Sequence, residues 1–211
     1  MLRAEIVAGN LVPGQRIVES FWASRFGVAQ ISVREAINLL ISDGFVTKAT
    51  GRSARVTSYS KIDIAEIYEV RGALEGLAAR LATERKADTQ PLRQYVVEMQ
   101  SSIAKGDMRR LLDADMQFHL QLCELSGNST LAAYSRTLLV PLFAFVSMRV
   151  ALIHQEPQAW KADIIRHKRV LELIEEGDPA SAEFAVRAAL SKFAQRARDI
   201  WETASQGEKA K

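Results

Sequence analysis

The stretch that decides the N-terminal fold is ASRFGVAQISVREA, which occupies residues 23–36. It begins with the small residue Ala23; Gly27 follows four positions later, and Val33 lies six positions further on. Glycine takes a positive φ at no steric cost and can end a helix, while a small and a branched apolar side chain let two helices cross closely. This spacing is typical of a helix-turn-helix unit, whose second helix enters the major groove of DNA. The stretch therefore predicts a DNA-binding function.

Flanking elements extend this unit to a winged helix-turn-helix domain. The sequence predicts three helices at residues 1–8, 18–26 and 29–42, and two strands at 45–48 and 54–57. A glycine-containing turn at 50–53 joins the two strands into a hairpin, which is the wing. Because a short polar connection follows at 57–61, we place this domain at residues 1–58.

The rest of the chain predicts an all-helical domain. From Ile62 onward, apolar residues recur at helical spacing and strand signals end. Turn sequences divide the region into about six helices, which we expect to form an antiparallel bundle. These turns lie at 87–89, 105–107, 126–129, 156–157 and 177–179. Pro141 falls inside the fourth expected helix and should kink or divide it, because proline removes a backbone hydrogen bond. We place this domain at 62–204, which makes the fold mostly α.

The composition favours a globular chain whose excess charge lies in the first domain. The chain has 211 residues, 48% of them hydrophobic, and a formal net charge of +3. Residues 1–60 hold seven Arg and Lys against four Asp and Glu, so the remainder is neutral; a basic unit suits contacts with phosphates. Apolar runs such as 138–146 are too short for a membrane span, and the single Cys123 allows no internal disulfide. We therefore expect a cytoplasmic protein with no membrane partner.

The second helix of the helix-turn-helix unit carries the side chains that we expect to contact DNA. Arg34 can hold a guanine edge or a phosphate, Gln30 can pair with adenine, and the two share a face because they are four residues apart. At the wing tip, glycine permits close approach and arginine is attracted to the minor groove. The remaining assigned DNA contacts are Ile31, Ser32, Gly51 and Arg52. The alternative is that the charged side chains are ordinary solvated surface residues.

Three side chains of the helical domain could hold a metal ion. Asp115 and His119 are four residues apart on one expected helix and project from the same face, and His167 on a later helix could complete the group. Imidazoles with a carboxylate suit zinc or nickel, among other divalent metals. The alternative is a His–Asp hydrogen bond inside the bundle.

Two arginines of the same domain are candidates for binding an anionic ligand. Arg71 lies among apolar neighbours, and a buried arginine needs an anionic partner. That partner is either the carboxylate of a small effector, held bidentately, or Glu75 four residues further on. Arg149 is the second candidate for the ligand pocket.

Short motifs follow one another in a fixed order along both domains. The N-terminal motifs are Ile6-x-x-Gly9-x-Leu11-x-Pro13-Gly14, Gly27-Val28, Val33-Arg34-Glu35-Ala36 and Asp43-Gly44-Phe45-Val46. The C-terminal motifs are Tyr68-Glu69-Val70-Arg71-x-x-Leu74-Glu75, Asp115-x-x-Phe118-His119, Ser126-Gly127-Asn128 and His167-x-x-x-Leu171. In this order and spacing, the chain resembles the GntR-type transcriptional regulators of the branch related to the fatty-acid regulator.

The resemblance implies a winged helix followed by an all-helical domain, called FCD, that binds the effector and dimerises. It also implies a metal centre of one Asp and three His, but the fourth position falls here at Ala189, which cannot bind a metal. The implied cofactor is a divalent metal held by three side chains; the alternative is that the change to alanine leaves no metal bound. In the recognition helix, Ala29 and Gln30 replace the Ser or Thr and the Arg usual in the family, which implies a different operator sequence.

We thus expect a regulator that is not an enzyme. It would act as a repressor, binding double-stranded operator DNA as a homodimer and responding to a small carboxylate effector. Two alternatives stay open. One is a metal-dependent hydrolase, in which Asp115, His119 and His167 leave an open position on a catalytic ion. The other is a constitutive DNA-binding regulator whose pocket has decayed.

Overall fold

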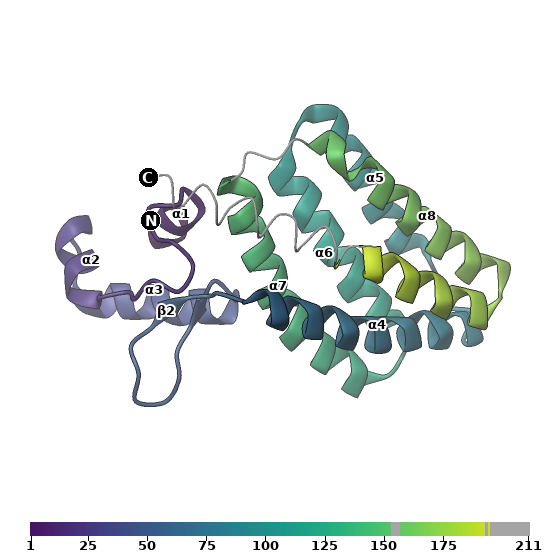
Figure 1. Cartoon of the computed structure of the whole chain (residues 1–211), viewed down its shortest axis with the longest axis horizontal. Helices are drawn as coiled ribbons and strands as arrows, with labels where there is room; N and C mark the ends of the chain where they lie inside the picture. The colour runs from purple at the N-terminus through teal and green to yellow at the C-terminus, as the bar shows by residue number, and fades with distance from the viewer. Residues whose placement is uncertain (153–156, 193, 195–211) are drawn as a thin grey trace. The chain divides into compact units, whose positions relative to one another are not determined.

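The N-terminal residues form the expected winged helix-turn-helix. The computed structural model describes residues 1–152, 157–192 and 194 of the chain. Its first elements are α1 (Leu2–Val7), α2 (Glu19–Phe26), α3 (Gln30–Ser42), β1 (Val46–Thr47) and β2 (Arg55–Val56) (Figure 1). The two strands pair antiparallel, with Val46 opposite Val56. Gly27 adopts a φ of 64°, and its N–H bonds back to the last turn of α2, which confirms the predicted glycine stop between the two helices.

The apolar stripe of α3 fixes which side of this helix remains exposed. Val33, Ile37 and Leu40 recur at helical spacing and are buried, together with Trp22 of α2. The side chains on the other side of α3, which include the predicted DNA contacts, face solvent. The core of the domain therefore holds α3 so that the side with the predicted DNA contacts faces outward.

The C-terminal region is the predicted all-helical bundle. Its elements are α4 (Lys61–Glu84), α5 (Gln90–Lys105), α6 (Met108–Leu125), α7 (Ser129–Leu152), η1 (Pro157–Trp160), α8 (Lys161–Glu176) and a helix at 179–192. Gly106 and Gly177 end two of these helices in left-handed conformations, at turns that the sequence predicts. The expected end of the last helix, near Trp201, lies outside the described residues. Helix α6 packs against both α4 and α5, so its buried face lies at the centre of the bundle.

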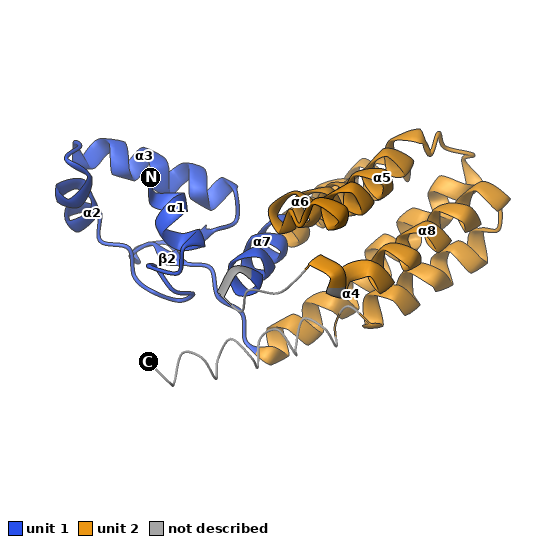
Figure 2. Ribbon diagram, turned by 90° about the horizontal axis from the view of Figure 1, so that it is seen from above, with its two compact units in different colours: residues 1–60, 140–154, 203–211 blue, residues 61–139, 155–202 orange. Residues whose placement is uncertain are grey.

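Helix α7 belongs to both compact units of the chain. One unit consists of residues 1–60 and the part of α7 that follows Leu139, and the other begins at Lys61 and includes the first part of α7 (Figure 2). Pro141 lies at this division, and α7 runs through it without being divided. In the first unit, Gly44 with φ +76° lies so close to α7 that a Cβ atom there would be 2.6 Å from Cα of Pro141.

Helix α7 is also the most apolar long helix among the described residues. Its segment Ser129–Val150 has a mean hydropathy of 1.5, which is enough, by length and composition alone, to cross a membrane. However, 56% of that segment is buried inside the structure. Core helices of globular proteins pass the same test, so the segment is weak support for a membrane span.

Candidate DNA-reading surface and candidate metal centre

The predicted DNA contacts lie on the exposed side of α3 and at the tip of the hairpin. The α3 residues Gln30, Ile31, Ser32 and Arg34 are all exposed. At the hairpin tip, Gly51 has a φ of +70° and Arg52 is exposed. The exposed side of the second helix of a winged helix-turn-helix is the surface that such a unit presents to the major groove.

A carboxylate that the sequence reasoning missed lies on this surface. Oε2 of Glu19, at the start of α2, accepts hydrogen bonds from Nε and Nη2 of Arg34, at 3.1 and 2.9 Å. The same oxygen accepts a hydrogen bond from Nε2 of Gln30 at 3.2 Å. Glu19 therefore joins the two helices of the helix-turn-helix through the two side chains that we predict to read bases. The sequence does place Glu19 at the start of the helix that precedes α3. Periodicity within one helix, however, does not predict which side chains of two helices contact each other.

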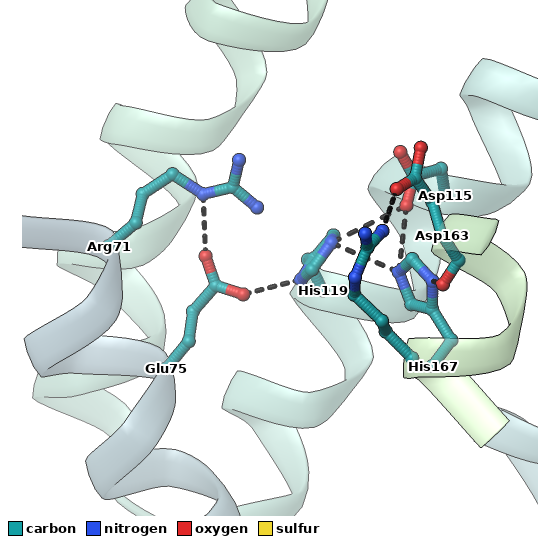
Figure 3. A network of polar contacts seen from close by, with 7 residues as sticks. Arg71, Glu75, Asp115, His119, Asp163 and His167 are labelled. Atoms are coloured by element: carbon teal, nitrogen blue, oxygen red, sulfur yellow. Dashed lines mark hydrogen bonds and ion pairs between the residues drawn. The ribbon is translucent and has the colours of Figure 1, made fainter. Parts of the chain in front are cut away.

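Three predicted metal ligands are brought together inside the bundle. Asp115 and His119 lie on α6 and His167 lies on α8, all three buried (Figure 3). Oδ1 of Asp115 is 3.4 Å from Nε2 of His119 and 2.9 Å from Nε2 of His167, and the two Nε2 atoms are 3.3 Å apart. Neighbouring ligands of a tetrahedral or octahedral metal with bonds of about 2.1 Å are separated by about 3.0–3.4 Å. The three atoms therefore have the spacing of ligands around one ion.

The outer nitrogens of both imidazoles have acceptors, which favours a proton on Nδ1 when the rings are neutral. Nδ1 of His119 contacts the Glu75 carboxylate, and Nδ1 of His167 is 2.8 Å from the backbone oxygen of Asp163. Because both partners are acceptors, each neutral imidazole carries its proton on Nδ1 and turns the lone pair of Nε2 inward. Oδ1 of Asp115 faces both Nε2 atoms and lies between them. Three buried lone pairs then converge on one point, which is the arrangement that a metal with oriented histidine ligands requires.

The charges around this centre hold its carboxylates in the ionised form. Burial by itself raises the pKa of Glu75, but the Arg71 guanidinium and His119 outweigh it and bring the pKa to about 2. Burial likewise raises the pKa of Asp115, and the two neighbouring imidazoles lower it further than burial raises it. The pKa of His119 is raised although burial lowers it, because the Glu75 carboxylate favours the charged ring. The ionised carboxylates therefore favour a positive charge on the group between them, either a proton on His119 or a metal ion.

The two candidate anion-binding arginines lie in different units. Arg71 of α4 is 2% exposed, and its Nε donates to Oε1 of Glu75 at 2.7 Å, so the pairing with Glu75 that the sequence left open is present. Its guanidinium also lies 4.8 Å from the centre of the Tyr68 ring. Arg149 is buried on the part of α7 that belongs to the first unit, 5.4 Å from the Phe145 ring. Effector binding at either arginine stays a prediction.

A small pocket adjoins the two imidazoles. His119 and His167 line it together with Arg166, Ala189 and mainly apolar side chains, and it has room for about one water-sized ligand. Ala189 thus lies beside the two imidazoles without offering a ligand atom. The nearby Cys123 is buried, and burial raises the pKa of its thiol to about 12, so it is no nucleophile at neutral pH.

Comparison with known protein families gives one match in each half of the chain. Residues 1–56 match the model of the bacterial regulatory proteins of the gntR family. Residues 66–192, more than half of the chain, match the FCD domain model. The winged helix carries the first match, and the bundle with the Asp115–His119–His167 group carries the second.

The chain is similar to several bacterial proteins named as transcriptional regulators. One is the Nta operon transcriptional regulator of Aminobacter aminovorans, 33% identical over 63% of this chain and 63% of that protein, which is less than two thirds of its length. Another is the probable D-xylose utilization operon transcriptional repressor of Paenarthrobacter nicotinovorans, 27% identical over 86% of this chain and 79% of that protein.

A solved structure, McbR/YncC of E. coli, has the same fold. It superposes with a TM-score of 0.73 at 21% identity and covers 95% of this chain and 94% of that one. The two family matches, supported by these likenesses, show that the chain is a DNA-binding transcriptional regulator and belongs to the gntR family of bacterial regulatory proteins, with an FCD domain.

Proposed function

We propose that the chain is a cytoplasmic, homodimeric repressor that binds operator DNA and is released from it by a small organic acid bound at a metal in the FCD domain. The observation that carries this proposal is the convergence of Oδ1 of Asp115 and the Nε2 atoms of His119 and His167. Regulation rather than hydrolysis is supported by the relatives, which are named as transcriptional regulators. The buried thiol of Cys123 supports the same choice.

The residues of the centre divide into metal ligands and residues that orient them. Asp115, His119 and His167 would hold a divalent ion such as zinc or nickel. Glu75 and the backbone oxygen of Asp163 keep both imidazoles in the tautomer that binds a metal. The ion, when bound, supplies a Lewis-acidic site for a carboxylate oxygen. With Ala189 in the place of a fourth side-chain ligand, at least one position stays available to a small ligand.

The charge count of the buried network favours a monoanionic effector. Arg71 and Glu75 cancel each other, and the Asp115 carboxylate cancels one of the two charges of a divalent ion. One uncompensated positive charge would then remain in a buried site, where a bare charge is costly. A carboxylate bound beside the ion removes this cost. The effector changes operator affinity only by its differential affinity for the two conformations of the dimer.

The metal part of the proposal is tested by reconstitution. We expect metal-stripped protein to take up one zinc or nickel ion per chain and to gain thermal stability, because the ion binds only the folded state. His167→Ala should lose the ion and the thermal shift while keeping its helical circular dichroism spectrum. As a matched control, Lys168→Ala changes the adjacent, partly exposed residue of α8 and should behave as the wild type. Equal metal content in wild type and His167→Ala would contradict the assignment.

The effector part is tested separately. Small monocarboxylates and dicarboxylates, added to metal-loaded wild type, should include one that raises the melting temperature and weakens binding to promoter DNA from the neighbouring genes. The same acid should act weakly on the His167→Ala protein. A shift of equal size in both proteins would place the effector away from the ion. DNA binding that responds to no acid, in protein that does bind metal, would support constitutive regulation instead.

A further inference from the structure

The Glu19–Arg34 pair places a carboxylate within the surface that faces DNA. A carboxylate there repels phosphates, so its presence on this surface has a cost for binding DNA. The pair is well formed, with side chains exposed by 20% for Glu19 and 50% for Arg34. The guanidinium lowers the pKa of Glu19, and the carboxylate raises the pKa of Arg34, so both stay charged at neutral pH. Nearby Lys48, which follows β1, also lowers the pKa of Glu19.

The net charge of the pair argues against a phosphate contact as the role of Arg34. A phosphate anchor works through its positive charge, and a carboxylate bonded at 2.9 Å neutralises that charge. A base edge, by contrast, is read by the direction of hydrogen bonds. A neutral pair with well-directed donors is therefore suited to reading a base and poorly suited to holding the backbone.

The geometry of the bonds shows which donors remain. Nε and Nη2 of Arg34 both donate to Oε2 of Glu19, so the carboxylate takes the side edge of the planar guanidinium. The end edge, formed by Nη1 and the second proton of Nη2, is left as a fork of two parallel donors. That fork matches O6 and N7 of guanine in the major groove. Because Glu19 fixes the plane of the guanidinium, less side-chain freedom is lost when the fork binds.

We propose that Glu19 is a positioning residue that holds Arg34 as a guanine reader, so that each operator half-site carries a guanine at the base pair that Arg34 reaches. The Nε2 group of Gln30, bonded to the same Oε2, is held beside this fork. The sequence reasoning left a guanine edge and a phosphate as alternatives for Arg34, and the pairing with Glu19 favours the guanine edge.

The test is selection of bound duplexes from a random pool by the full-length protein, followed by affinity measurements on the selected site. Wild type should enrich a motif with a guanine in each half-site. Replacing that guanine should weaken binding by about 10- to 100-fold per site. Arg34→Lys, which keeps the charge but lacks the fork, should lose most of this preference and retain non-specific binding. Glu19→Gln should also lower the specific-to-non-specific ratio, while its non-specific affinity rises because a negative charge is removed.

Glu5→Gln is the matched control for the change of charge. Glu5 forms an ion pair with Arg25 in the same unit, at 3.9 Å, and its side chain is 21% exposed, close to the value for Glu19. It should keep the wild-type motif and guanine preference. The proposal is overturned if Glu19→Gln keeps the full guanine preference, or if Arg34→Lys does so, or if Glu19→Gln binds every sequence more tightly by the same factor. If wild type enriches no motif at all, the failure lies instead with operator binding itself.

Discussion

At the scale of single residues, Glu75 joins two buried functions. One oxygen of its carboxylate accepts from Nε of Arg71, and the other contacts Nδ1 of His119, so one side chain both neutralises a buried arginine and orients a proposed metal ligand (Figure 3). Partners that orient a ligand in this way commonly change metal affinity by about 10- to 100-fold when mutated. In the proposed metal centre, Glu75 would therefore act on the ion without touching it.

Glu75→Gln should weaken metal binding by about 10- to 100-fold, because the neutral amide no longer favours the proton on Nδ1 of His119. The change also leaves Arg71 with less compensation, so a loss of stability accompanies it. Competition with a chelating dye, at a temperature where circular dichroism shows both proteins folded, gives the affinity. Glu98→Gln, in the exposed pair with Arg110, serves as control and should leave the affinity unchanged. Metal affinity of Glu75→Gln equal to that of wild type would show that Glu75 has no orienting role.

The sequence predicts only part of this residue network. Asp115 and His119 are found by their i,i+4 spacing, and the same spacing suggests Arg71 with Glu75. The contact between Glu75 and His119 depends on how α4 packs on α6, and no periodicity encodes that packing. Glu19 was missed for the same reason, because its partners lie on the next helix.

At the scale of elements, the turn after α3 packs tightly against the backbone of α7. Gly44 follows the end of α3 with φ +76°, and a Cβ atom built on it would point at the backbone of α7 at Pro141. Gly44 lies two residues past the predicted end of this helix at residue 42, but its contact with a residue far along the chain could not be predicted. The turn therefore depends on α7 for its packing as well as on glycine for its conformation.

Gly44→Ala should destabilise the protein by more than the positive φ alone explains. An L-residue in a left-handed conformation costs about 1–2 kcal/mol, and a Cβ atom 2.6 Å from Cα of Pro141 forces backbone movement that costs about 1–3 kcal/mol more. Gly51→Ala is the matched control, because Gly51 has φ +70° and no atom near its Cβ position. Equilibrium urea unfolding of both variants separates the two costs. Equal losses of unfolding free energy in the two variants would show that the contact with Pro141 relaxes at no energetic cost.

At the scale of the whole molecule, two buried groups make stability depend on alkaline pH. Burial raises the pKa of Cys123 from 9.0 to about 12 and that of Tyr68 from 10.0 to about 12. Above pH 9 the unfolded chain loses these protons first, so the folded state binds more protons and the free energy of unfolding falls as pH rises. Below about pH 8, both groups are protonated in either state, and the effect vanishes.

The expected fall due to Cys123 alone is about 2 kcal/mol between pH 9 and pH 10.5, at about 1.4 kcal/mol per pH unit. Cys123→Ser removes the titrating thiol and should flatten the curve by that amount, whatever its stability at pH 8. Urea unfolding at pH 8, 9, 10 and 10.5 supplies the comparison. Parallel curves for the two proteins would show that the thiol ionises equally easily in the folded state.

The division of α7 between two units limits how far this regulator is modular. A cut or fusion point after residue 60 looks natural, because it falls in the short connection before α4. Such a cut removes the stretch of α7 on which Gly44 rests and against whose Phe145 ring Tyr59 packs. In a hybrid that joins this winged helix to another sensory bundle, the turn after the recognition helix would therefore pack against a different helix. Exchange of sensory parts within the family would succeed only when the receiving helix carries a compatible Pro141 segment.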